Sequence, residues 1–155
     1  MNIHLKKNHG FTMLEIIAVL LIMAIVTVVA VSKVASTSEY ELKLQTDVIK
    51  SHLRYAQIRA IKSNGQWGIC CDGSSYWLFR NDGSTTVKVI LPGENSDTVT
   101  LPSGVTVSTE TVSFDDWGSP YANADTTHPS TDITITVTCN GTESILITKN
   151  TGYID

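Results

Sequence analysis

The architecture of this chain follows from Gly10-Phe11-Thr12-Met13-Leu14-Glu15 and from the nearly unbroken apolar run Ile16–Val31 behind it. The segment Phe11–Val31 has about 20 residues, enough for a helix to cross a hydrocarbon core of roughly 30 Å. Glu15 is the exception in this segment, because a carboxylate at membrane depth is costly unless another group compensates its charge. We therefore predict a transmembrane helix in which Glu15 has a function.

Basic residues precede the apolar segment and predict its orientation. Lys6 and Lys7 lie before it together with His4 and His9, whereas no acid does. By the positive-inside rule, residues 1–10 stay in the cytoplasm and the remainder of the chain is exported.

These residues resemble the type IV pilins and pseudopilins, whose precursors carry a short basic leader, a Gly, a Phe and a Glu four residues after that Phe. The resemblance implies that prepilin peptidase cleaves between Gly10 and Phe11 and that the new amine of Phe11 is N-methylated. It implies a bacterial inner-membrane protein with a periplasmic head, which an assembly ATPase and a membrane platform insert into a filament. Glu15 is then the assembly residue, because its pairing with the Phe11 amine of an adjacent subunit neutralises both charges and fixes the axial register.

Two other interpretations of the N-terminus remain open. An ordinary single-span anchor can carry an acid near one end, and Ala30-Val31-Ser32 has the small residues of a signal-peptide cleavage site. The mature protein would begin at Phe11 with an added methyl group in a pilin, at Lys33 after signal cleavage, or at Met1 in a plain anchor.

Helical periodicity returns after the small polar stretch Ser32–Ser38. We predict that the helix continues to Ser63 and ends at Asn64-Gly65. No proline occurs between residues 11 and 64, so any bend in Ser32–Ser38 would depend on Ser and Thr side chains that compete for backbone hydrogen bonds. The expected buried face consists of Leu42, Ile49, Leu53, Ala56 and Ala60, joined by Val48 and His52.

From Trp67 onward, short β-prone runs alternate with turn residues, which predicts an antiparallel sheet and an α+β head. Ile133, Ile135 and Val137 alternate with threonines, so one face of that run is apolar. Asn140-Gly141 predicts a tight hairpin turn with two positive φ angles. The predicted strands are Trp67–Cys71, Tyr76–Arg80, Thr86–Leu91, Asp97–Leu101, Val105–Ser108, Thr111–Phe114, Asp132–Cys139 and Glu143–Lys149.

A second resemblance is to the GspH/FimT minor pilins. The end of the helix, Leu53–Ile61, is similar to theirs, as are Phe114–Pro120, Ile145–Thr148 and Thr151–Ile154. It implies the type IV pilin fold, a long N-terminal helix packed against an antiparallel sheet, and a minor subunit of a type IV pilus or a type II secretion pseudopilus. Asp115 with Gly118-Ser119-Pro120 also has the composition of a turn closed by an Asx-type hydrogen bond.

The two resemblances and the composition divide the chain into four segments. The expected segments are a cleaved leader (1–10), a transmembrane and filament-core helix (11–31), its amphipathic continuation (32–64) and a β-rich head (65–155). Loss of the leader leaves nine basic side chains against 15 acids, a net charge of −6. This charge and the lack of a basic cluster argue against nucleic acid as a partner, since such binding neutralises phosphates.

Three cysteines lie in the part of the chain that we place in an oxidising compartment. Cys139 can pair with Cys70 or Cys71, but not with both, because adjacent strand residues point to opposite faces. The third thiol is then left over. Metal binding is the alternative, but these cysteines form no CxxC pair and have no nearby His to complete four ligands.

We expect no enzymatic activity and no cofactor. His52 and His128 have no recognisable nucleophile motif around the serines. Three acid-containing stretches indicate turns and lack the spacing of oxygen ligands in a calcium loop: Asp72-Gly73, Asn81-Asp82-Gly83 and Asp115-Asp116. Two hypotheses follow for the function: a structural filament subunit, or a filament-tip module whose Thr-rich loops bind a surface, a secreted substrate or DNA.

Overall fold

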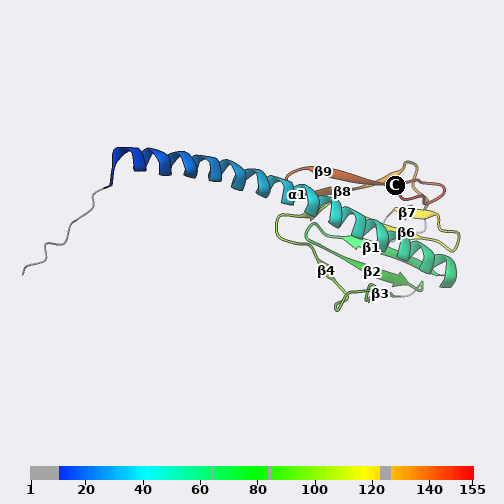
Figure 1. Ribbon diagram of the computed structural model, residues 1–155. Helices are drawn as coiled ribbons and strands as arrows, with labels where there is room; N and C mark the ends of the chain where they lie inside the picture. The colour runs from blue at the N-terminus through cyan, green and yellow to red at the C-terminus, as the bar shows by residue number, and fades with distance from the viewer. Residues whose placement is uncertain (1–10, 64, 84, 123–126) are drawn as a thin grey trace, which may run out of the picture. The chain divides into compact units, whose positions relative to one another are not determined.

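The computed structural model describes residues 11–63, 65–83, 85–122 and 127–155 (Figure 1). The chain forms two compact units, which divide between Thr37 and Ser38. Helix α1, Met13–Ser63, contributes to both of them. The predicted leader, including Gly10, and the predicted stop residue Asn64 lie outside the described residues.

The first unit consists of the apolar part of α1. Its segment Met13–Ala30 has a mean hydropathy of 2.8 and is long and apolar enough to cross a membrane. The side chains of this segment are exposed on all sides, as expected for a helix that has lipid or other helices around it. The backbone remains helical through residues 32–38, the stretch in which the sequence analysis considered a bend.

In the second unit, α1 buries one face against two sheets. Leu42, Ile49, Leu53, Ala56 and Ala60 are buried as predicted. Val48 is only half-buried, whereas Thr46 is fully buried. The Thr46 hydroxyl donates to the carbonyl of Leu42 at 2.8 Å, so the helix itself satisfies this polar group in the core.

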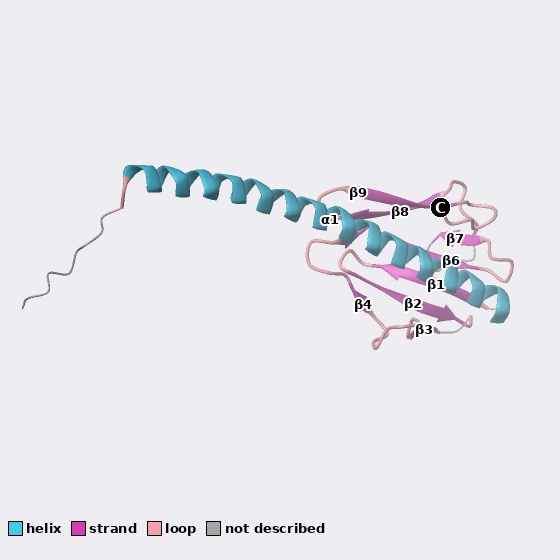
Figure 2. Ribbon diagram, viewed as in Figure 1, coloured by secondary structure: helices cyan, strands magenta, loops and turns pink. Residues whose placement is uncertain are grey.

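The strands form two antiparallel sheets (Figure 2). The larger sheet has the order β3-β2-β1-β6-β7, with β4 also paired to β2, and the smaller has the order β5-β8-β9. Both sheets contribute to one hydrophobic core with α1. The strands are β1 (Gln66–Cys71), β2 (Ser75–Asn81), β3 (Thr86–Val89), β4 (Val99–Thr100), β5 (Thr106–Val107), β6 (Thr111–Phe114), β7 (Pro120–Ala122), β8 (Ile133–Thr138) and β9 (Thr142–Ile147).

The predicted α+β class and the alternation in β8 are confirmed. Ile135 and Val137 are fully buried and face the core together with Ile145 and Ile147 of β9. Five predicted strands are shorter than expected: β3 ends at Val89, β4 and β5 have two residues each, and β8 and β9 end at Thr138 and Ile147. Strand β7 was not predicted, because its proline at position 120 reads as a turn residue rather than as the start of an edge strand.

The turn between β8 and β9 differs in detail from the prediction. Thr138 pairs with Thr142, so the connection consists of Cys139, Asn140 and Gly141. Asn140 has a positive φ of 50°, but Gly141 does not take one. The turn packs against the start of the second unit: Asn140 donates to the hydroxyl of Ser38 at 3.1 Å, and Gly141 lies against Leu42.

One polar contact joins α1 to β2 inside the core. His52 Nδ1 lies 2.9 Å from the hydroxyl of Tyr76, at the predicted boundary between helix and sheet. Tyr76 is fully buried and His52 nearly so. Burial lowers the pKa of His52 below its usual value of 6.5 and, although Glu94 opposes this, the imidazole remains neutral in the folded protein at pH 7.

We predict that acid destabilises the head through His52. The lowered pKa means that the unfolded chain takes up a proton that the folded chain does not. The free energy of unfolding therefore falls as pH drops below about 6.5, by at most about 1.4 kcal/mol per pH unit. Denaturant titrations of the full chain in detergent from pH 7.5 to 5 should lose this slope in His52→Gln and keep it in His128→Gln, whose side chain is exposed. Equal slopes in the wild type and His52→Gln would contradict the prediction.

Candidate assembly site

The N-terminus of α1 is capped by Thr12. The backbone N–H of Glu15 donates to the Thr12 hydroxyl at 3.2 Å and to its carbonyl at 3.1 Å. Thr12 thus occupies the N-cap position and Glu15 the N3 position, and the Thr12 hydroxyl satisfies one of the free N–H groups at the start of the helix. A negative charge in the first turn also interacts favourably with the helix dipole. The local sequence therefore explains why the acid can occur here.

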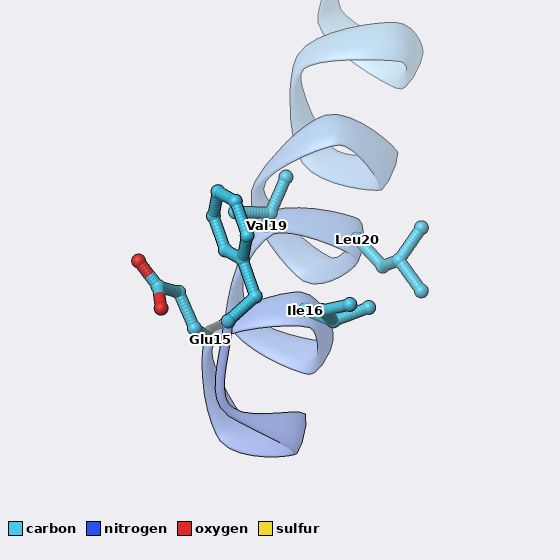
Figure 3. A pocket seen from close by; sticks show the side chains of 5 residues that line it. Glu15, Ile16, Val19 and Leu20 are labelled. Carbon is cyan, nitrogen blue, oxygen red and sulfur yellow. The ribbon is translucent and has the colours of Figure 1, made fainter. Parts of the chain in front are cut away.

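Capping leaves the carboxylate of Glu15 directed outward. Figure 3 shows it beside the helix, with Val19 above it and with Ile16 and Leu20 on the adjoining surface. Phe11 belongs to the same shallow apolar hollow and is 79% exposed. Among the described residues, no basic side chain forms an ion pair with Glu15. Once this surface is buried, the charge needs a partner from outside the described chain.

A second site joins three of the four segments that resemble GspH/FimT minor pilins. Gln57 of α1 donates from Nε2 to the carbonyls of Gly118, at 2.8 Å, and Gly152, at 2.9 Å. Arg54, one turn earlier, donates to the carbonyl of Ile154 at 3.0 Å. We call Gln57, Gly118 and Gly152 the Gln57 junction, because it connects the helix, the β6–β7 turn and the C-terminal segment. The sequence did not predict the Gln57 junction, because the residues around a glutamine do not indicate which distant backbone groups it binds.

Two glycines make the Gln57 junction possible. Gly152 has a φ of 64°, and a Cβ there would collide with the carbonyl of Gly118 and lie 2.6 Å from Gln57 Nε2. Gly118 has a φ of 80°, and its missing side chain leaves room for Ile61. The left-handed backbone and the close approach both require glycine.

The turn interpretation of Asp115 is confirmed. Its Oδ1 accepts hydrogen bonds from the backbone N–H groups of Trp117, at 2.9 Å, and Ser119, at 2.7 Å. Asp72 likewise accepts from Ser75, and Asn81 accepts from Gly83. The side-chain oxygens of Asp72, Asn81 and Asp115 therefore stabilise the turns in which these residues lie.

The two histidines considered in the sequence analysis lie in different environments. His52 is in the core, whereas His128 lies on the surface of the β6–β7 region. The His128 ring stacks on Tyr121 with centroids 4.6 Å apart, and its Nε2 is 3.9 Å from a carboxylate oxygen of Asp115. Across the described ranges, no group of three or more potential metal-ligating side chains gathers.

The cysteines are free thiols in the structure. Cys71 and Cys139 are buried in the same hydrophobic core, whereas Cys70 faces the other way and its Sγ accepts a hydrogen bond from the Thr111 hydroxyl at 3.2 Å. Burial raises the pKa of Cys71 to about 12, so this group is a thiol rather than a thiolate at neutral pH. Cys71, and not Cys70, thus belongs to the core that includes Cys139.

Two family models and one solved structure resemble this chain. The family model of type II transport protein GspH matches residues 45–152, and that of the prokaryotic N-terminal methylation motif matches residues 5–31. Among solved structures, the type IV minor pilin FimU of Pseudomonas aeruginosa PAO1 has a similar fold. The TM-score is 0.55 at 17% sequence identity, over 77% of this chain and 90% of that one. No curated protein matches the chain.

An apolar N-terminal helix, an antiparallel head and the likeness to FimU define a type IV pilin-like fold. The chain belongs to the GspH family of type II transport proteins, as the match over residues 45–152 shows. The predicted resemblance to minor pilins and the predicted fold are thereby confirmed.

We predict that Gly152→Ala destabilises the head by about 2–4 kcal/mol, because a methyl group collides with the Gly118 carbonyl and the positive φ disfavours alanine. The matched control is Gly73→Ala, which has a φ of 97° but open space around it and should cost about 1–2 kcal/mol. Denaturant unfolding of the full chain in detergent measures both values. A loss no larger for Gly152→Ala than for Gly73→Ala would refute the packing role of the junction.

Proposed function

We propose that the chain is a structural, non-enzymatic subunit of a type IV pilus or a type II secretion pseudopilus, assembled through its N-terminal helix. The observation that carries this proposal is Glu15, an acid inside an apolar, membrane-length helix with no ion-pair partner among the described residues. The match of residues 5–31 to the N-terminal methylation motif and the GspH family support it.

The proposed maturation has two steps. Prepilin peptidase cleaves between Gly10 and Phe11, and the new Phe11 amine is methylated. The amine remains positively charged after one methylation, so it can pair with a carboxylate. Residues 11–31 then form the filament core, residues 32–64 continue the helix, and residues 65–155 complete a head outside the core.

The proposed orientation has the leader in the cytoplasm and the head in the periplasm, which follows from Lys6 and Lys7. Other pilins or pseudopilins and an inner-membrane assembly platform are the proposed partners. Packing of apolar helices against one another replaces their contacts with lipid, and this exchange leaves the Glu15 carboxylate in a medium of low polarity. Its pairing with the Phe11 amine of the next subunit then selects one axial register.

The decisive variant is Glu15→Ala, which removes the carboxylate and keeps a helix-forming residue. Mass spectrometry should find its mature N-terminus still at methylated Phe11, while its recovery in sheared filaments falls by about tenfold or more, as expected for a lost pairing worth at least 1.4 kcal/mol. Glu110→Ala, a change of an exposed acid in the head, is the control and should assemble normally. A mature start at Lys33 or Met1, or normal incorporation of Glu15→Ala, would contradict the proposal.

We also propose that Cys139 pairs with Cys71 in the periplasm, because these two side chains share the core. A periplasmic disulfide-bearing oxidant would take up the two electrons and two protons of the thiols and be reduced to its dithiol form. The bond would form before Cys71 is buried, since the buried thiol reacts slowly. Peptide mapping without reduction should find a Cys71–Cys139 link, and reduction should lower the stability of the head by about 2–4 kcal/mol. A Cys70–Cys139 link, or three alkylatable thiols in the native protein, would be the opposite result.

A further inference from the structure

A cleft of about 500 Å³ opens beside the last turn of α1. Its lining includes Arg59 and Ser63 of the helix, Trp67 near the start of β1 and Arg80 near the end of β2. The head around it is acidic, because residues 38–155 contain eight basic and 14 acidic side chains. Two guanidinium groups in one cleft are therefore a local exception to the charge of the head.

An aromatic ring orders the first of the two arginines. The guanidinium of Arg59 lies over the indole of Trp67, with 4.6 Å from Cζ to the ring centroid. Trp67 is only 3% exposed, and its Nε1 donates to the Ser63 hydroxyl at 2.6 Å. Stacking uses the face of the guanidinium and leaves its N–H donors available. Among the described residues, no carboxylate forms an ion pair with Arg59.

The second arginine has an acid beside it. Arg80 is the cross-strand partner of Trp67, so the two side chains point to the same side of the sheet. The ion pair of Arg80 with Asp82 is 3.8 Å long, and both side chains are about half exposed, so it contributes little. Oδ1 of Asp82 accepts hydrogen bonds from the backbone N–H and the hydroxyl of Thr85, at 3.2 and 3.3 Å. Two arginines against one aspartate leave the cleft with one unit of positive charge.

This charge indicates the class of ligand. Guanidinium groups bind planar oxygen anions, above all carboxylates and phosphates. One residual positive charge matches one carboxylate, whereas a phosphate group carries about 1.5–2 negative charges at pH 7 and would also be repelled by Asp82. A polyanion such as DNA is repelled in addition by the acidic remainder of the head. A single carboxylate therefore fits the cleft best.

We propose that the cleft binds a Glu or Asp side chain of a different pilin subunit that lies next to this chain in the filament. Arg59 and Arg80 are exposed at the surface of the head, so a side chain can reach them while the backbone of the partner stays outside. The neighbours of a minor subunit are mostly other pilins, so the carboxylate comes from a different chain. This inference rests on the proposed function and adds a contact between heads to the Glu15 contact of the core.

The first experiment measures whether the cleft binds a single carboxylate, with N-acetyl-glutamate N-methylamide as the probe. The probe is titrated at constant ionic strength into the full chain in detergent. Binding is followed by the NMR signals of the side-chain N–H groups of Arg59 and Arg80 and of the Trp67 indole. We expect saturable shifts of all three signals. Arg80→Gln should weaken binding by about fivefold, which corresponds to roughly 1 kcal/mol for one charge-assisted hydrogen bond.

Lys88→Gln is the matched control, because Lys88 is also an exposed cation against a tryptophan, Trp77 at 3.9 Å, but lies outside the cleft. Its affinity for the glutamate probe should equal that of the wild type. The glutamine analogue of the probe has nearly the same shape without the charge and should not bind. Tighter binding of inorganic phosphate than of the glutamate probe, or an equal loss of affinity in the two variants, would overturn the inference.

The second experiment tests the source of the carboxylate in filaments. Lys62 is exposed in the last turn of α1, next to Ser63, and is replaced by the photo-crosslinker p-benzoylphenylalanine. We expect a crosslink to a pilin of different sequence, within a peptide that contains Glu or Asp. Arg80→Gln should lower its yield about fivefold, and Lys88→Gln should leave it unchanged. Arg80→Glu and the reversal of the partner's acid to arginine should each abolish the crosslink, and the two together should restore it.

A crosslink that does not depend on Arg80, or that forms only with a second copy of this chain, would overturn the inference. Failure of the proposed function gives a different result. A chain that keeps Met1 or is absent from filaments contradicts the structural-subunit proposal, and the proposed occupant with it. A processed and incorporated chain that does not bind the glutamate probe contradicts the inference alone.

Discussion

The head depends on one carboxamide, that of Gln57, which holds the carbonyls of Gly118 and Gly152 at the same time. These carbonyls belong to two different segments: the turn of the β6–β7 hairpin, and the C-terminal segment that a bridge between Ile147 and Ile154 attaches to β9. The junction occurs together with a positive φ at both glycines and with the hydrogen bond from Arg54 to Ile154, while Asp115 itself closes the β6–β7 turn. The apolar face of the helix provides most of the stabilisation, and the Gln57 junction selects how the loops close around it.

The helix changes its environment along its length, and its sequence changes accordingly. Residues 13–30 are apolar all round, which suits a segment surrounded by lipid or by like helices. Residues 42–60 are apolar only where Ile49, Leu53 and Ala56 meet the sheets. In the first part the informative residue is the single acid, because its charge is uncompensated. In the second part the informative residues are polar groups that are fully satisfied inside the protein.

Features that depend only on residues close together in the sequence could be predicted. The buried face of α1, the alternation in β8 and the Asx turn at Asp115 follow from local periodicity and local hydrogen bonding, and all three were predicted. The His52–Tyr76 bond, the Gln57 junction and the Arg59–Trp67 stack connect residues far apart in the chain or across elements, so nothing local indicates them. Strand β7 was missed, and the β8–β9 turn has one positive φ in place of the predicted two, because proline and Asn-Gly fit more than one backbone geometry.

Gln57 also sets an order of events. Its two acceptors lie 61 and 95 residues further along the chain, and Ile154, the acceptor of Arg54, lies 100 residues beyond that arginine. A ribosome therefore makes the helix long before the segment that closes over it. Part of the core has to stay open until residues 152–154 have been made and can reach α1.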